Sequence, residues 1–165
     1  MARGLDGLDR ELVGLLAEDG RLSVAAAAKR ASVSRPTVAA RLRSLLSSGA
    51  LKVAGLIDGF EVKGLTTALV GLTLDKYKLD EKMVEIANLD QVGWAAVVTG
   101  RYDIIVEVTT EEGIAGLYEF LSVSLHNVGG IRSSEMFVVM KARNKWMLLP
   151  FGMRRTWLSG AAGDE

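Results

Sequence analysis

The chain opens with three short stretches in which apolar residues recur every three or four positions, the spacing of amphipathic helices. Asp6, Ser23 and Ser34 precede the three stretches, and all belong to residue types that cap helix N-termini. Gly49 follows the third stretch and favours a helix end there. The pattern therefore predicts a helix-turn-helix domain in residues 1–50.

The pattern then becomes strand-like and rich in glycine over residues 51–64, which we interpret as a wing and hinge. Beyond residue 64 the apolar residues recur with a period of two in some stretches, typical of strands, and with a period of 3.6 in others, typical of helices. The predicted elements are a strand over 65–75, a helix over 79–89, strands over 94–99 and 104–109, a helix over 112–127 and a strand over 133–142.

The order βαββαβ in residues 65–145 predicts a ferredoxin-like domain, in which both helices cover one face of an antiparallel sheet. The fold class is therefore α+β. Leu69, Phe137 and Val139 point to the face without helices, so that face is apolar as well. Such a face needs a partner, and a second copy of the chain in a twofold dimer is the simplest one.

Charge separates the two halves of the chain although the formal net charge is zero. Residues 1–64 carry 10 basic against 7 acidic residues, and residues 65–165 carry 10 against 13. No acidic residue lies between Asp19 and Asp58, a stretch with seven basic residues. A basic helical segment in a neutral chain indicates a nucleic-acid partner, here double-stranded DNA.

The candidate DNA contacts lie at the start and on the outer side of the third predicted helix. Hydroxyl and guanidinium groups there suit phosphates and base edges in the major groove. Arg41 lies at the flank of the core face, so it fits either a phosphate contact or a structural ion pair. The candidates are Ser34, Arg35, Thr37, Arg41 and Arg43.

Composition excludes several chemistries. The chain has no cysteine and a single histidine, His126, near the predicted end of a helix, so we expect no metal site, no cofactor and no enzymatic activity. The N-terminus lacks the apolar core of a signal peptide, and no run of about 18 apolar residues could span a bilayer. These features predict a cytoplasmic protein with no membrane partner.

Several short motifs, spread over roughly residues 5–145, together resemble the Lrp/AsnC (feast/famine) family of transcription regulators. They open and close the first helix, precede and occupy the third, form a glycine-rich turn between two strands, and mark the last strand. The residues that carry the likeness are 8–10, 19–21, 33–34, 41–43, 49–51, 100–103 and 130–140.

The resemblance implies a DNA-binding regulator that responds to a small effector, an amino acid, and that forms a homo-oligomer, either a dimer or an octamer. In the effector pocket that the resemblance implies, Asp103 would accept a hydrogen bond from the ammonium group of the amino acid, and backbone amides near Gly100 would hold its carboxylate. The chain departs from the family at Arg101, where an acidic residue is common, and at Met136, where a hydroxyl is. The implied effector residues are Gly100, Arg101, Tyr102, Asp103, Ser134 and Met136.

Two other functions fit the same architecture. One is an enzyme similar to siroheme decarboxylases, against which the single histidine and the basic helix count. The other is an architectural DNA binder without effector response. Residues 146–165 form a C-terminal tail without a counterpart in the family: its apolar start should pack, and its Gly-rich, acidic end should be disordered.

Overall fold

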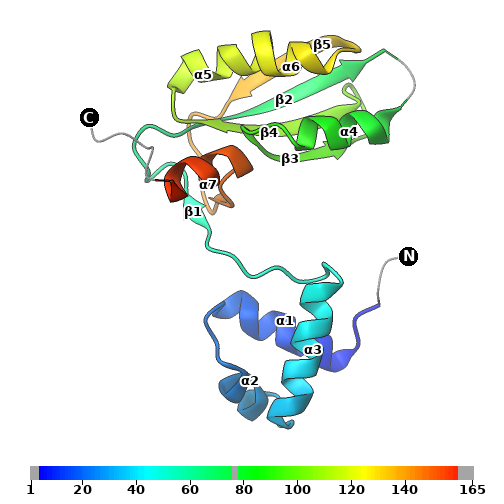
Figure 1. Cartoon of the computed structure of the whole chain (residues 1–165), viewed down its shortest axis with the longest axis vertical. Helices are drawn as coiled ribbons and strands as arrows, with labels where there is room; N and C mark the ends of the chain where they lie inside the picture. The colour runs from blue at the N-terminus through cyan, green and yellow to red at the C-terminus, as the bar shows by residue number, and fades with distance from the viewer. Residues whose placement is uncertain (1–3, 76–77, 160–165) are drawn as a thin grey trace. The chain divides into compact units, whose positions relative to one another are not determined.

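Met1–Gly55 and Leu56–Glu165 form separate units in the computed structural model, which describes residues 4–75 and 78–159 (Figure 1). We call them the N-terminal and C-terminal units. None of the helices in the described part of the chain combines the length and the apolar character needed for a membrane span.

Three helices make up the N-terminal unit: α1 (Gly7–Glu18), α2 (Val24–Arg30) and α3 (Arg35–Ser47) (Figure 1). Their three predicted N-caps are confirmed, because the side chains of Asp6, Ser23 and Ser34 each accept a hydrogen bond from a backbone N–H in the first turn. Leu12 and Val38 are almost fully buried between the helices. The apolar stripe read from the sequence is thus the core of this unit.

The predicted wing over residues 51–64 does not form. Residues 51–56 carry no strand, and the one strand in this region, β1 (Ile57–Asp58), pairs antiparallel with β6 (Trp146–Met147). The strand-like pattern could not reveal this, since alternation shows that a segment is extended but does not identify its partner.

The C-terminal unit contains a four-stranded antiparallel sheet in the order β3-β4-β2-β5 (Figure 1). This order and the intervening helices confirm the ferredoxin-like arrangement. The long second helix is a continuous stretch with a π-helical turn, η1, in its middle. The elements are β2 (Thr66–Leu74), α4 (Leu79–Ala87), β3 (Val92–Val97), β4 (Ile104–Thr110), α5 (Gly113–Glu119), η1 (Phe120–Ser124), α6 (Leu125–Val128) and β5 (Ile131–Val138).

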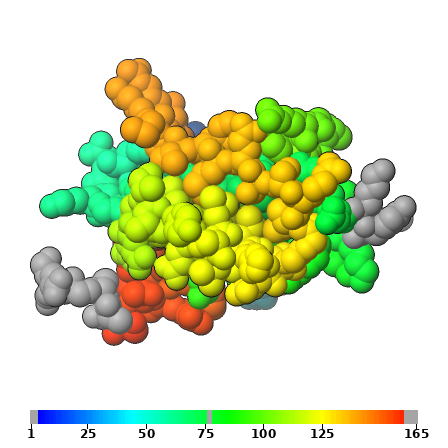
Figure 2. Space-filling view, turned by 90° about the horizontal axis from the view of Figure 1, so that it is seen from above, coloured from blue at the N-terminus to red at the C-terminus, as the bar shows by residue number. Residues whose placement is uncertain are grey.

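Helix α4 and the α5–α6 stretch cover the same face of the sheet. Val70 and Val106, paired across β2 and β4, are fully buried beneath Ile86 of α4 and Phe120 of η1. Figure 2 shows the yellow α5–α6 stretch beside β5, which is drawn in orange. We call the face of the sheet under the helices the helix-covered face and the opposite one the helix-free face.

The helix-free face is less bare than the sequence predicts. Tyr102 lies over Gly71, since a Cβ atom on that glycine would come within 2.6 Å of the tyrosine ring. Further along, Lys145 reaches the buried carboxylate of Glu107, with 2.7 Å between Nζ and Oε2. Trp94 and Phe137 remain 44% and 48% exposed on this face.

The apolar start of the C-terminal tail packs only in part, since Met147 is buried whereas Trp146 and Phe151 are 60% and 55% exposed. After β6 the chain turns at Pro150 into α7 (Phe151–Leu158), and the Met153 side chain is buried. The predicted disorder of the last residues concerns 160–165, which lie outside the described residues.

Candidate functional site

The outer surface of α3 gathers four of the five predicted DNA contacts. Ser34, Arg35, Thr37 and Arg43 are all exposed, and the first two lie at the N-terminal end of the helix. The Ser34 Oγ atom accepts from the Thr37 backbone N–H and lies 2.8 Å from Thr37 Oγ1. Neither Arg35 nor Arg43 forms an ion pair with any residue that the structure describes. Their charges are therefore available to an anionic partner.

Arg41 behaves differently from its neighbours on α3. Its Nη1 atom lies 2.5 Å from Asp6 Oδ2 and 3.3 Å from Asp9 Oδ1, the two carboxylates that form the capping box of α1. The Asp9 backbone N–H first, and then Arg41, hold the pKa of the Asp6 carboxyl below its usual value, and Asp6 in turn raises the pKa of Arg41. The structure thus favours the ion-pair alternative for Arg41: it joins α3 to α1.

The loop of residues 100–103 connects β3 to β4 and is fastened to β2. The Asp103 Oδ2 atom accepts from the Leu74 backbone N–H at 2.8 Å, and the Asp103 N–H donates to the Leu72 carbonyl. Gly100 adopts φ +121°, a conformation that a residue with a side chain rarely takes. Asp103 therefore holds the loop to β2, and its contact with a ligand stays a prediction.

Arg101 and Tyr102 meet a residue that the sequence analysis missed. Glu135 of β5 forms an ion pair with Arg101, at 3.0 Å, and accepts a hydrogen bond from the Tyr102 hydroxyl. This hydrogen bond raises the pKa of Tyr102, an effect that Arg101 partly offsets. Phe137, two residues on, packs edge-to-face against the Tyr102 ring. Period-two alternation in the last strand would have placed Glu135 and Phe137 together, but not beneath this loop.

The predicted effector residues do not come together within one chain. Ser134 and Met136 pair with Leu72 and Val70, so both belong to the helix-covered side of β5. Tyr102 lies on the helix-free face, over Gly71. A pocket that contains all six predicted residues would therefore need two copies of the chain.

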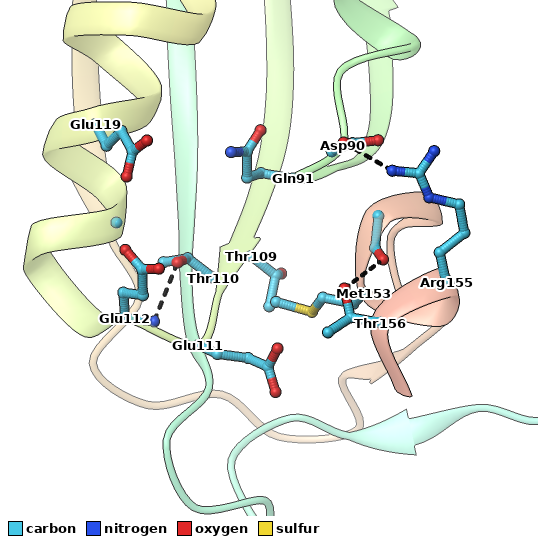
Figure 3. Close-up of a pocket in the computed structure, with 12 residues that line it drawn as sticks. Asp90, Gln91, Thr109, Thr110, Glu111, Glu112, Glu119, Met153, Arg155 and Thr156 are labelled. Carbon is cyan, nitrogen blue, oxygen red and sulfur yellow. Dashed lines mark hydrogen bonds and ion pairs between the residues drawn. The ribbon is translucent and has the colours of Figure 1, made fainter. Parts of the chain in front are cut away.

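A polar cavity of about 250 Å³ lies where β4, α5 and α7 meet (Figure 3). Asp90, Glu111, Glu112 and Glu119 line it together with Arg155. Several of these groups have partners, because Arg155 pairs with Asp90 at 3.5 Å and Glu111 accepts from the Trp157 ring N–H. Within the described residues no three His, Cys, Asp or Glu side chains are placed so that they could hold a metal ion, and His126 is exposed in the last turn of α6.

The fold and these surfaces define a class of protein: a helix-turn-helix protein with a basic outer helix, joined to a ferredoxin-like domain. Comparison with family models gives the same two parts. Residues 5–46 match the AsnC-type helix-turn-helix domain, and residues 67–146 match the Lrp/AsnC ligand binding domain. The chain belongs to the Lrp/AsnC family.

Relatives and solved structures agree with this assignment. An uncharacterised HTH-type transcriptional regulator of Pyrococcus abyssi is 32% identical over 143 residues, which cover 86% of this chain and 89% of the relative. The leucine response regulatory protein of Mycobacterium tuberculosis superposes with a TM-score of 0.74 at 25% identity, over 86% of this chain and 96% of that one.

A third similar structure is a transcriptional regulator of Neisseria meningitidis in complex with L-Met. Its TM-score is 0.70 at 21% identity, over 92% of this chain and 99% of that one. Taken with the family models, these findings show that the protein is a transcriptional regulator with a DNA-binding helix-turn-helix domain and an Lrp/AsnC ligand-binding domain.

Proposed function

We propose that the protein binds specific DNA sequences through α3 and that an amino acid, bound at the loop of residues 100–103, changes this binding. The observation that carries the first part is the pair of exposed arginines, Arg35 and Arg43, that no described acidic residue neutralises. Phosphate contacts from such side chains fix the helix on the duplex, while Thr37, on the same exposed surface, faces the bases.

A selection experiment tests the sequence specificity. A library of random DNA duplexes is bound to the full chain, and the retained sequences are compared between the parent protein, Thr37→Ala and Ser47→Ala. Ser47 lies at the other end of α3, so it serves as the matched control. The parent and the control should enrich one shared motif and Thr37→Ala a different one. Retention of the unselected library by the parent would instead support the architectural alternative.

The effector part of the proposal rests on Asp103 and Arg101, which lie two positions apart in the loop. The carboxylate of Asp103 would bind the ammonium group of an amino acid, and the guanidinium of Arg101 would bind its carboxylate. The Neisseria regulator of the same fold, solved with L-Met, supports an amino acid as the class of ligand. Thermal unfolding of the full chain with each of the twenty amino acids tests this, and at least one should raise the melting temperature.

We propose that two copies associate through the helix-free face. Trp94 and Phe137 expose large apolar side chains there, and burying apolar surface contributes about 25 cal/mol per Å². Light scattering on Phe137→Glu should show a smaller particle than the parent, whereas Tyr118→Glu, exposed on α5 instead, should not.

The siroheme-decarboxylase alternative gains no support from the structure. His126 is exposed at a helix end, and the family models matched are those of DNA-binding and ligand-binding domains. Absorption spectra after incubation with haem test this alternative, since bound haem would produce a shifted Soret band.

A further inference from the structure

A second cavity, of about 390 Å³, shares α7 with the cavity of Figure 3 but has different walls. The end of α4, the start of β3 and the segment of residues 148–151 enclose it, together with Arg154. Residues beyond 146 lie outside both matched family models. This cavity is therefore built in large part by a segment that family membership does not explain.

Arg154 is the only charged side chain that lines this cavity, within the described residues, and its charge is not neutralised there. Its Nε atom is buried and has no hydrogen-bond partner in that part of the chain. The next residue provides a contrast, because Arg155 pairs with Asp90. The Arg154 guanidinium also lies 5.7 Å from the centroid of the Phe151 ring, a contact that uses the face of the guanidinium rather than its in-plane N–H groups.

A buried N–H of a guanidinium without an acceptor is unfavourable, so the position calls for an anion or a water molecule. A planar carboxylate fits best, because it accepts two parallel hydrogen bonds from one edge of a guanidinium.

The other walls indicate the rest of the ligand. Leu148, Leu149 and Pro150 form one side with Phe151, and Val92 lies on the other. Asn88 also lines the cavity, but most of the lining side chains are apolar and suit an aliphatic body. No acidic side chain is among the described residues that line the cavity, so the ammonium group of an amino acid would lack a charged partner.

We propose that this cavity is a second ligand site, specific for a small aliphatic carboxylic acid without an ammonium group, whose carboxylate pairs with Arg154. The α4 helix ends at the cavity, and its last carbonyls carry partial negative charge, so the carboxylate lies at the Arg154 end and the aliphatic body fills the remainder. The site lies at the start of β3, and the 100–103 loop follows the end of that strand, so the two sites are separate.

Titration calorimetry on the full chain tests the proposal with 4-methylpentanoate as the probe and 4-methylpentanamide as its neutral counterpart. The parent protein should bind the acid but not the amide. Arg154→Gln should weaken binding of the acid about tenfold or more, because a charge-assisted bidentate contact is lost. Arg155→Gln, the matched control, should bind the acid as the parent does.

A second variant acts through volume instead of charge. Ala87 lines the cavity from α4, so Ala87→Leu should fill part of it and weaken binding while Arg154 stays in place. This variant decides the matter if Arg154→Gln fails to fold. Asp103→Asn should leave binding of the acid unchanged, which separates this site from the proposed amino-acid site.

Four results would overturn the proposal: no binding of the acid to the parent at millimolar concentration, equal binding of the amide, equal binding of the acid by a folded Arg154→Gln, or equal binding of the acid by Ala87→Leu. Absence of binding would mean that water, rather than a ligand, satisfies Arg154, and each of the other results would mean that binding depends neither on the Arg154 charge nor on this cavity. The proposed DNA and amino-acid functions would remain, because neither depends on this cavity.

Discussion

The two regions that carry the proposed function treat their charges in opposite ways. On α3, Arg35 and Arg43 are exposed and form no ion pair with any described residue. In the 100–103 loop, Arg101 pairs with Glu135, and Asp103 is bound to the backbone of Leu74. A DNA-binding surface keeps its positive charges free for a large polyanion. In the effector loop the charged side chains already have partners within the chain, so they must give up these contacts to bind a ligand.

The same contrast occurs within α3. Arg41 and Arg43 are two positions apart, yet Arg41 faces two carboxylates of the α1 capping box and Arg43 faces solvent. Residues two apart on a helix lie about 200° apart around its axis, so equal charge in sequence does not imply equal role.

The largest effect should come from removing the free charges. Arg35→Ala/Arg43→Ala should weaken DNA binding roughly 100-fold at moderate salt and reduce the slope of log affinity against log salt by about 2, since each phosphate contact releases a counterion. Fluorescence anisotropy over a salt series measures both quantities. Lys63→Ala, which removes one charge outside the N-terminal unit, is the control. An unchanged slope in the double variant would contradict the assignment of α3.

A smaller effect is expected on amino-acid binding at the loop of residues 100–103. Asp103→Asn should weaken binding of the stabilising amino acid by about 10- to 150-fold, because a charge-assisted hydrogen bond to its ammonium group is lost. The amide oxygen of asparagine can still accept from the Leu74 N–H, so the unliganded melting temperature should change little. Asp58→Asn, another turn aspartate that accepts from a backbone N–H, should respond to the amino acid as the parent does. An equal response by Asp103→Asn would exclude this loop as the effector site.

The buried pair on the helix-free face extends the comparison to stability. Lys145→Met leaves the carboxylate of Glu107, which is 3% exposed, without its cation and should lower the free energy of unfolding of the C-terminal unit by about 2 kcal/mol. Adding Glu107→Gln should recover part of this loss, since no buried charge is then left. Urea unfolding measures both variants, with Lys141→Met, an exposed lysine, as control. A loss equal to that of the control would show that the pair contributes nothing.

The smallest effect concerns the ion pair of Arg41 with Asp6 and the pH dependence of the stability that it provides. The folded-state pKa of Asp6 lies below its ordinary value of 3.8, so the ionised form stabilises the fold above that pH, and this contribution is lost as the pH falls through the folded pKa. Arg41→Ala should lower the melting temperature of the N-terminal unit by a few degrees at neutral pH and should narrow the difference between neutral and acidic pH. Calorimetry on both proteins checks this, and parallel pH profiles would argue against the ion pair.

The sequence came close to the fold because its signals are local. The caps at Asp6, Ser23 and Ser34 act within one helical turn, and period-two alternation placed Leu69 and Phe137 on the same sheet face, as the pairing of β2 with β5 shows. The exposed surface of α3 followed from the same helical periodicity, since its core face was fixed by Val38 and Leu45.

Tertiary structure decided which distant segments meet. The strand after the hinge pairs with β6 instead of forming a wing, Glu135 reaches the 100–103 loop, and Arg41 binds the α1 cap, all across more than thirty positions of chain. Nor could the sequence show that Ser134 and Met136 lie across the sheet from Tyr102, or that residues 148–151 line a cavity beside Arg154, which pairs with no described carboxylate. Hydrophobic pattern and capping act between near neighbours, whereas these contacts depend on how the chain closes its long loops, which no short stretch of residues specifies.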